Sequence, residues 1–503
     1  MALYSISSSA PTCSWRHGND NHTVDETLRK TLRDRFRLSE LYPLQAKIIE
    51  QVMQCRHALV VMPTGSGKSL CYQLPALALP TPGLTLVFSP LIALMEDQVA
   101  ALKSKQIRAE FINSTLERAE RLERYNKLAV GAYDLVYVTP ERMHKPEFTD
   151  AMARVAGGVK LLAVDEAHCI TKWGHDFRPA YQEIGQFRQL LGSPPTIALT
   201  ATATAAVRTD IRRTLGLDEE QMPLFATGID RPNLSFEAKE IWKDEERIND
   251  ICEIASRWRG TGIVYYTLIK HLERDALEFR ARWGADRIEI YHGQLQPSEK
   301  KRVYDRFAAS APEDELMLLA TNAFGMGVDK PDIRFIVHAQ VPGSVEAYYQ
   351  EVGRAGRDGN PSQCVLLYEE EDLAIQQDFV GWRNPGRALL EEAAHKLASS
   401  RDGDISVDEL REEIIHRDRG DRRAEYCVLA LEKLGVIEPS DVTGRYRFVR
   451  ALAEGELDDE ELEAKKLRDL SRLLDIVKLV RSDDIRRFVL DHFELDNADD
   501  SDT

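Results

Sequence analysis

Short apolar runs recur along the first 370 residues and are separated by segments of helical length. In the first part of this region the runs cover 57–62, 84–90, 134–140, 159–168 and 196–202. Continuous apolar runs of this kind are typical of strands that are buried on both faces, as in a parallel sheet covered by helices. The pattern therefore predicts an α/β domain, for which we take the bounds 25–230.

A second set of apolar runs repeats the same pattern, at 262–267, 287–293, 315–322, 333–340 and 363–370. The simplest interpretation is a second parallel-sheet domain in tandem with the first, covering residues 231–385. One large sheet is the alternative, but a single core stops growing at roughly 250–300 residues. The sequence thus predicts two α/β domains of similar construction.

The pattern changes after residue 385. Helical periodicity covers 388–399, 407–417 and 424–437, and a short strand is predicted within 444–452. Three helices followed by a strand resemble a winged helix, so 386–453 is predicted to be a winged-helix-like module, with a small helical packing module as the alternative. Beyond it, 454–503 holds an acidic run, a long helix over roughly 459–492 and an acidic end, whereas 1–24 is a polar, Ser-rich segment that we expect to be a flexible tail.

The composition is that of a globular protein, with 43% hydrophobic residues and 30% charged residues among 503. The formal charge of −17 argues at first against a nucleic-acid partner. However, residues 454–463 and 491–503 hold seven and six acidic residues and no lysine or arginine, which leaves −4 on the rest of the chain. The acidity is therefore local and does not exclude a basic track elsewhere.

The seven cysteines include no CxxC pair, and their odd number favours reduced thiols over a disulfide framework. No apolar stretch approaches the ~18 residues of a membrane-spanning helix. The first residues lack the apolar core of a secretory signal. We therefore expect a cytoplasmic protein, or a nuclear one if the source is eukaryotic, with no membrane partner.

A glycine-rich loop follows the first predicted strand, in the segment VVMPTGSGKSL at 60–70. Gly65 and Gly67 allow the backbone to turn its N–H groups toward phosphate oxygens, with Thr64 and Ser66 completing the loop. Lys68 is placed to reach the β- and γ-phosphates, and Ser69 to hold Mg²⁺. The first glycine of the simple pattern is Met62 here. The segment predicts an ATP site with Mg²⁺.

Two carboxylates end the apolar run at 159–168. Functional groups of parallel sheets gather at the carboxyl ends of strands, which is where Asp165 and Glu166 stand. We expect Asp165 to hold Mg²⁺ and Glu166 to orient and deprotonate the attacking water of a phosphoryl transfer. The alternative is an ordinary solvated strand end.

A third candidate element is YYQEVGRAGRDG at 348–359, which carries Gln350, Arg354 and Arg357. Arginines that reach across a cleft stabilise charge on a transferred phosphoryl group. The two arginines are three residues apart, so on a helix they would share one face. The alternative is a basic surface turn.

These motifs together resemble the RecQ family of superfamily 2 DNA helicases. The resemblance covers roughly residues 30–370 and rests on the following segments in order: MPTGSGKS (62–69), SPLIALMEDQV (89–99), VTPER (138–142), DEAHCITKWGHDFRPAY (165–181), ALTATAT (198–204), YHG (291–293), ATNAFGMGVDKPDIRFIVH (320–338) and YYQEVGRAGRDG. The aromatic-rich loop directly after DEAH is the most specific of them.

The resemblance implies two tandem RecA-like parallel-sheet domains and ATP-driven unwinding of duplex DNA with 3′→5′ tracking along single-stranded DNA. It assigns Trp173, His175, Phe177 and Arg178 to the coupling of DNA contact with hydrolysis, which agrees with the stacking of bases on aromatic faces. Core packing is the alternative for Trp173 and Phe177. By the same resemblance Thr200 and Thr202 link hydrolysis to domain movement, Thr139, Glu141 and Arg142 contact the DNA backbone, and Asp329 lies at the nucleotide cleft.

The sequence departs from the family in two places. Gln45 fits as the reader of adenine, but Leu38 stands where the stacking aromatic is usual, so Tyr42 is the candidate to replace it. In 482–503, Ile485 occupies the first cysteine position of the family's zinc element and the later cysteines are absent. Structural zinc needs four soft ligands, so no zinc site is expected and 454–503 is interpreted as a degenerate relic of that element.

The leading hypothesis is an ATP-dependent 3′→5′ DNA helicase that acts in DNA repair and recombination. The alternative, motivated by the missing zinc ligands, is a DNA-stimulated ATPase that remodels or docks protein–nucleic acid complexes without processive unwinding. RNA as the main substrate is a weaker third interpretation. We expect a monomer, and a basic protein is a candidate partner for the acidic C-terminal segment.

Overall fold

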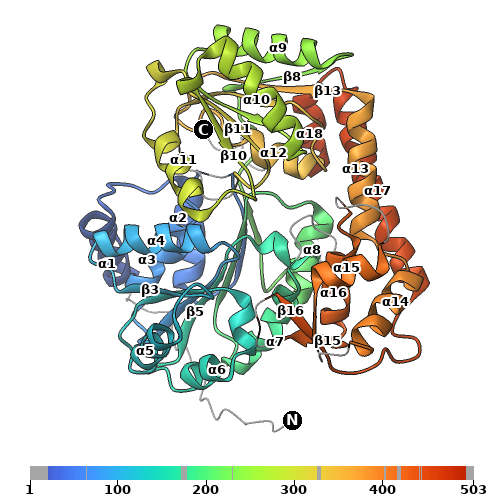
Figure 1. The fold of residues 1–503 in the computed structure, drawn as a ribbon. Helices are drawn as coiled ribbons and strands as arrows, with labels where there is room; N and C mark the ends of the chain where they lie inside the picture. The colour runs from blue at the N-terminus through green and yellow to red at the C-terminus, as the bar shows by residue number, and fades with distance from the viewer. Residues whose placement is uncertain are drawn as a thin grey trace.

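The computed structural model describes residues 21–63, 65–171, 178–228, 230–325, 330–400, 404–415, 421–440, 442 and 444–493. Two domains, each with its own sheet, lie one above the other, and a smaller C-terminal module packs beside them (Figure 1). The predicted fold class, two parallel-sheet domains and a mostly helical C-terminal region, is confirmed. Within the described residues no helix is both long enough and apolar enough to cross a membrane.

The first domain is built on a seven-stranded sheet of order β3-β4-β2-β5-β6-β1-β7, in which every pairing is parallel. The five predicted apolar runs form the five inner strands, whereas the two edge strands were not predicted. The strands are β1 (Ala58–Val61), β2 (Leu84–Phe88), β3 (Ala109–Ile112), β4 (Leu135–Val138), β5 (Val159–Val164), β6 (Thr196–Thr200) and β7 (Leu224–Ala226).

Helices cover both faces of this sheet. One core joins α2, α3 and α4 to the strands, and a second core on the other face joins α5 to α8. The elements are α1 (Asn21–Thr31), the π-helical turn η1 (Leu32–Phe36), α2 (Pro43–Met53), α3 (Leu70–Ala78), α4 (Ile92–Ser104), α5 (Arg118–Ala129), η2 (Pro140–His144), α6 (Pro146–Ala153), η3 (Ala167–Ile170), η4 (Pro179–Glu183), α7 (Ile184–Leu190) and α8 (Ala205–Leu215).

The second domain has a six-stranded parallel sheet of order β10-β11-β9-β12-β13-β8. The strands are β8 (Leu234–Glu240), β9 (Thr261–Tyr265), β10 (Ile288–Tyr291), β11 (Met317–Ala320), β12 (Ile333–His338) and β13 (Ser362–Tyr368). Its helical elements are α9 (Asp244–Arg257), α10 (Ile269–Trp283), η5 (Ala285–Arg287), α11 (Pro297–Ala309), η6 (Pro312–Asp314), α12 (Val345–Val352) and α13 (Glu370–Arg383). Helices α9 and α10 bury one face of the sheet, and α11 and α12 bury the other.

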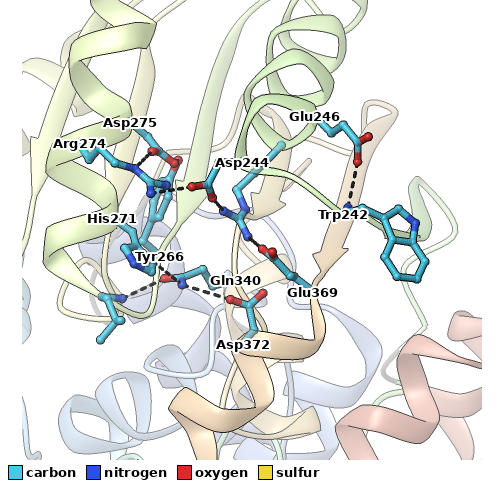
Figure 2. A network of polar contacts seen from close by, with 12 residues as sticks. Trp242, Asp244, Glu246, Tyr266, His271, Arg274, Asp275, Gln340, Glu369 and Asp372 are labelled. Carbon is cyan, nitrogen blue, oxygen red and sulfur yellow. Dashed lines mark hydrogen bonds and ion pairs between the residues drawn. The ribbon is translucent and has the colours of Figure 1, made fainter.

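A buried polar network fastens α13 to this domain (Figure 2). The Arg247 guanidinium, in a side chain only 2% exposed, forms ion pairs with Asp244 and with Glu369. Gln340, just after β12, donates to Asp372 at 3.2 Å. Burial raises the pKa of Asp372 to about 6, although Arg247 and the Gln340 hydrogen bond oppose the shift. The network fixes the start of the helix that leads out to the C-terminal module.

The C-terminal module combines three helices with a small antiparallel sheet of order β14-β16-β15. The three predicted helices and the predicted strand are present, and β14 and β15 were not predicted. The elements are α14 (Arg387–Ala398), β14 (Asp404–Ser406), α15 (Val407–Ile414), α16 (Arg423–Lys433), β15 (Ile437–Pro439) and β16 (Arg445–Phe448).

The single long helix predicted over 459–492 is wrong, because the segment forms α17 (Asp459–Val480) and α18 (Ile485–Phe493). Short polar side chains capture backbone N–H groups at the break: Ser482 Oγ accepts from Asp484, and Asp484 Oδ1 accepts from Arg487 at 2.9 Å. Such local bonds compete with helix continuation. The turn sends α18 back onto the second domain, where Ile485, Val489 and Phe493 enter the core.

The thiols fit the expectation of a reduced protein at five positions, since Cys71, Cys169, Cys252, Cys364 and Cys427 are free. The expectation is wrong for Cys55, which is disulfide-bonded. Cys55 is only partly buried, at the end of α2, and has a left-handed backbone with φ of 57°.

Candidate active site

The glycine-rich loop leaves the buried strand β1 and ends where α3 begins. Gly65 and Gly67 have φ angles of 82° and 76°, in the left-handed region that only glycine adopts without strain. Space is as restrictive as conformation, because a Cβ on Gly67 would lie 2.6 Å from the Gln45 side-chain nitrogen. Backbone N–H groups of such a loop, followed by a helix N-terminus, form an anion-binding cradle.

Gln45 on α2 supports this loop from behind. Its Nε2 donates to the carbonyl of Ser66 at 3.0 Å, and its Oε1 accepts from the backbone of Tyr42 at 3.1 Å. The predicted adenine-reading residue thus contacts the phosphate loop directly. The Tyr42 side chain beside it is 71% exposed, which leaves its ring surface accessible for stacking.

Lys68 is held close to the loop and to two acids. Its Nζ donates to the carbonyls of Met62 at 2.9 Å and Pro63 at 3.2 Å. Burial lowers the pKa of Lys68, and the charges of Glu166 and Asp165 offset part of that shift. The ammonium group therefore lies among the candidate phosphate and metal ligands.

Asp165 and Glu166 follow β5 at the carboxyl edge of the sheet. Asp165 is 9% exposed, its backbone N–H donates to Phe88 at 2.8 Å, and its carbonyl accepts from the Tyr181 hydroxyl at 3.0 Å. Burial, reinforced by the charge of Glu166 and opposed by that of Lys68, raises the pKa of Asp165 above its usual range. A nearby cation would return this carboxylate to its charged form.

Glu166 itself has a left-handed backbone, with φ of 46°. Strained residues of this kind cluster at functional sites. Its carboxylate lies 3.3 Å from Nδ1 of His168, and the same nitrogen lies 2.9 Å from the hydroxyl of Thr200. Thr200 in turn donates to the carbonyl of Thr202 at 2.9 Å. The two predicted coupling threonines are therefore in contact with the acidic pair through one histidine.

The second domain meets this site through Gln350 and Arg357. Gln350, on α12, donates to the Thr202 hydroxyl of the first domain at 3.4 Å. Arg357 packs against the phosphate loop, since a Cβ on Gly65 would lie 3.0 Å from its Cδ. Its positive charge is close enough to lower the pKa of Lys68.

The two arginines do not share a helix face, because α12 ends at Val352, before either of them. Arg354 is 5% exposed and points back into the second domain, where it hydrogen-bonds to Tyr265 and approaches Gly325. Only Arg357 is shown to reach the phosphate loop. Arg354 and Arg357, to which the sequence motif assigns the same role, therefore lie in different surroundings.

Residues 353–360, which carry Arg354 and Arg357, are called the arginine-bearing segment below. Arg231 and Asn233 hold this segment, and the sequence did not predict this role for them. Arg231 donates to the carbonyls of Ala355 at 3.0 Å and Gly356 at 2.8 Å, and Asn233 donates to Gly356 at 2.8 Å. These partners are more than 120 residues apart in the chain. No local pattern marks such a contact, so sequence reasoning had no signal for it.

The predicted nucleic-acid residues stand at the same edge of the first sheet. Thr139 follows β4, is 6% exposed and accepts from the backbone of Arg142 in η2 at 3.0 Å. Glu141 is exposed beside them, and Arg178 precedes η4 with its N–H bonded to Cys169. Five predicted site residues lie outside the described residues: Thr64, Trp173, His175, Phe177 and Asp329.

Ser69 and the buried Asp165 are the candidate ligands for a hard divalent cation near Lys68, because such a cation prefers hydroxyl and carboxylate oxygens. Such a site takes few ligands from the protein. Across the part of the chain that the structure describes, no group of three or more His, Cys, Asp or Glu residues could hold a metal. The absence of zinc stays a prediction.

Comparison with known families matches both sheet domains. Residues 42–210 match the DEAD/DEAH box helicase family, and residues 246–359 match the helicase conserved C-terminal domain. The first match contains the phosphate loop and the acidic pair, and the second contains Gln350, Arg354 and Arg357.

The chain is 43% identical over 361 residues to the ATP-dependent DNA helicase RecQ of Bacillus subtilis, covering 71% of this chain and 57% of that protein. It is 38% identical over 354 residues to the probable ATP-dependent DNA helicase RecS of the same organism, covering 70% and 69%. The yeast ATP-dependent helicase SGS1 is 39% identical over 389 residues, which cover 26% of its length. The chain thus spans little more than half of its RecQ relative.

Solved structures share the fold at low identity. The DUF1998 helicase MrfA bound to DNA superposes with a TM-score of 0.56 at 20% identity, covering 86% of this chain and 63% of MrfA. Saccharomyces cerevisiae Dbp5 bound to RNA and ADP BeF3 gives a TM-score of 0.55 at 16% identity, covering 71% and 91%. At these identities both likenesses show a shared fold.

Proposed function

The chain belongs to the RecQ family of superfamily 2 helicases, and from this premise we propose that it is an ATP-dependent DNA helicase. It couples ATP hydrolysis to 3′→5′ movement along single-stranded DNA and to unwinding of the duplex ahead. The observation that carries the proposal is the approach of Arg357, from the second domain, to Gly65 of the first domain's phosphate loop. A nucleotide on that loop would be contacted by both domains, so its hydrolysis would change how they are held together.

The residues of the site have distinct proposed roles. Residues 64–67 cradle the phosphates through backbone N–H groups, and Lys68 binds the β- and γ-phosphates. Ser69 and Asp165 would hold Mg²⁺, which neutralises phosphate charge when bound. Glu166 orients the attacking water and accepts its proton, and Arg357 stabilises charge on the transferred group.

Other residues around the phosphate loop and the acidic pair have proposed roles in binding the base, in binding DNA and in coupling the two domains. Gln45 reads the adenine edge with Tyr42 stacking on its ring, and Asp329 lies at the same cleft. Trp173, His175, Phe177 and Arg178 couple DNA contact to hydrolysis, whereas Thr139 and Arg142 bind the phosphate backbone without reading its sequence. Gln350, Thr200 and Thr202 pass the nucleotide state between the domains, which their contacts support.

We test the function with strand displacement on 3′-tailed, 5′-tailed and forked DNA. Wild type is expected to displace the strand of the 3′-tailed and forked substrates and to leave the 5′-tailed duplex intact. Lys68→Ala is expected to abolish both hydrolysis and displacement while leaving the fold intact. Displacement by Lys68→Ala at the wild-type rate would overturn the mechanism.

A second candidate is a DNA-stimulated ATPase that remodels or docks protein–nucleic acid complexes without processive unwinding. The observation that favours it is Ile485, which is buried in the core of the second domain at the position where the family has a zinc-binding cysteine. Stimulated hydrolysis without strand displacement on any of the three substrates would support this candidate. Stronger stimulation by single-stranded RNA than by DNA would instead favour an RNA substrate.

The wider context is also a proposal. We propose that the protein acts in DNA repair and recombination, in the cytoplasm. We further propose that it is a monomer without structural zinc and that residues 386–453 form a winged-helix-like module. A basic protein is the proposed partner of its acidic C-terminal end. Light scattering of the purified chain and its metal content test the oligomeric state and the absence of zinc.

A further inference from the structure

Arg486, in the first turn of α18, binds residues 230–234, which lead from the first sheet domain into β8 and are called the connecting segment below. Its guanidinium forms an ion pair with Asp230 and donates to the carbonyls of Arg231, at 3.0 Å, and Leu234. The same group lies over the ring of Phe236, with its central carbon 5.4 Å from the ring centroid. A planar donor group with several partners fixes geometry more tightly than a single ion pair does.

The connecting segment in turn holds the arginine-bearing segment. Arg231 donates to the carbonyls of Gly353, Ala355 and Gly356 at 3.4, 3.0 and 2.8 Å, so its partners flank Arg354 on both sides and directly precede Arg357. The path of the backbone that presents both arginines is therefore set by Arg231, whose own carbonyl is bound by Arg486.

The opposite end of α18 reaches two further parts of the site. The Phe493 ring packs 5.4 Å from the ring of Tyr349, the residue before Gln350. The Phe493 carbonyl accepts from Arg208 at 3.3 Å, and Arg208 also donates to Ala203, the residue after Thr202, at 3.2 Å. One nine-residue helix thus contacts the connecting segment and α12 directly, and reaches the threonine segment of the first domain (200–203) through Arg208.

A charged contact holds the first turn of α12 as well. His492 of α18 lies 3.3 Å from the Glu346 carboxylate. Burial alone would raise the pKa of Glu346, but the His492 hydrogen bond and the charge of Arg472, on α17, outweigh it and keep that pKa well below its usual range. Both C-terminal helices therefore bind the helix that leads into the arginine-bearing segment.

We propose that α18 is a positioning element for the arginine-bearing segment and that Arg486 is its central positioning residue. Within the described residues Arg486 contacts the connecting segment and Phe236 and not the phosphate loop, so it acts on the arginine-bearing segment through Arg231. The inference rests on the proposed function, since the group it positions is the Arg357 that we assign to transition-state stabilisation. A misplacement of about 1 Å in such a group can cost roughly 10²-fold in rate.

Arg487 offers a matched control on the same helix, because its ion pair with Asp491 is confined to the exposed surface of α18. In the full chain, Arg486→Ala is expected to lower the DNA-stimulated kcat for ATP by about ten- to 100-fold, with KM for ATP changed far less. Arg487→Ala is expected to retain the wild-type kcat. Arg486→Lys, which keeps the charge but loses the fork, is expected to fall between them and to fold even if the alanine variant does not.

Hydrogen exchange of the amides in 353–360 provides a readout that needs no turnover. Exchange there should speed up in Arg486→Ala and not in Arg487→Ala. If wild type hydrolyses ATP and the Arg486 variants match it in both kcat and exchange, the positioning role is wrong and the proposed function stands. If wild type does not hydrolyse ATP, the proposed function fails, and exchange alone decides whether Arg486 orders the segment.

Discussion

Nδ1 of His168 lies 2.9 Å from the hydroxyl of Thr200. The Thr200 hydroxyl has one proton, which it donates to the carbonyl of Thr202. It can therefore only accept a hydrogen bond from the His168 imidazole. His168 Nδ1 is therefore the donor in this contact. Because the same nitrogen faces Glu166 and the Thr202 hydroxyl is bound by Gln350, an unbroken series of contacts joins the acidic pair to the second domain.

Thr200→Val tests this series, because valine keeps the shape of threonine and removes the acceptor. Leaving one buried partner unsatisfied costs about 1–3 kcal/mol, or roughly 5- to 160-fold if it appears in the transition state. We expect the DNA-stimulated kcat to fall within that range and the ATP affinity to change little. Thr200→Ser, which keeps the hydroxyl, is the control, and equal kcat values for the two variants would contradict the role of the contact.

Gly67→Ala is expected to disrupt nucleotide binding by displacing Gln45. The added Cβ would meet the Gln45 side chain at 2.6 Å, in addition to the backbone strain of about 1–2 kcal/mol at positive φ. Gly455, which precedes α17, has a similar φ of 83° with no neighbouring atom within 4 Å, so Gly455→Ala controls for the loss of stability that backbone strain alone causes. Titration with a fluorescent ATP analogue should show at least about a tenfold loss for Gly67→Ala only. A similar loss in both variants would show that general destabilisation, and not a change in the phosphate loop, causes the loss.

Asp372→Asn should remove one pH-dependent part of the stability of the second domain. The folded protein raises the pKa of Asp372 from 3.8 to about 6, chiefly by burial, so between these values it holds a proton that the unfolded chain has lost. Stability therefore falls as pH rises from about 4 to 6, by up to about 3 kcal/mol. Denaturant titrations of the two proteins at pH 4 and pH 7 should show a smaller fall for the variant. Identical falls would show that Asp372 ionises normally in the folded protein.

Removing residues 494–503 should strengthen DNA binding at low salt. The deletion removes five acidic residues. Exposed charges act over about a Debye length, so we expect roughly two- to fivefold tighter binding at low ionic strength and little change at high salt. The deletion begins after Phe493 because that side chain is fully buried. A chain of the same length with neutral amides at the five positions should behave like the deletion, and unchanged affinity in both would reject repulsion by the tail.

The buried strands were predictable from sequence because burial on both faces produces continuous apolar runs. Among the edge strands of the two parallel sheets, β10 was predicted, whereas β3, β7 and β8 were not. In β3 the middle residues Glu110 and Phe111 are only partly buried, and β8 alternates between buried and exposed positions with charged residues at its end. An edge strand loses the signal because one of its sides is open to solvent.

The candidate site also contains some residues that the sequence could predict and others that it could not. Lys68, Asp165 and Glu166 stand in local motifs that predict their chemistry, and the structure brings their charges close together. The approach of Arg357 to Gly65 joins residues almost 300 positions apart, and the sequence motif did not show which of Arg354 and Arg357 makes it. Arg231 and Arg486 were missed because their partners are backbone carbonyls, which leave no pattern in the sequence.

The packing of α18 also determines the order in which the two sheet domains can complete their folding during synthesis. The second domain finishes its last strand at Tyr368, yet part of its core consists of Ile485, Val489 and Phe493, some 120 residues later. At synthesis rates of about 5–20 residues per second, that interval lasts roughly 6–25 s. During this time the first domain has all its strands and can fold, whereas the second exposes the apolar surface that α18 will cover. Nascent chains arrested before residue 485 should therefore bind chaperones more than chains that have passed residue 493 and cleared the ribosome.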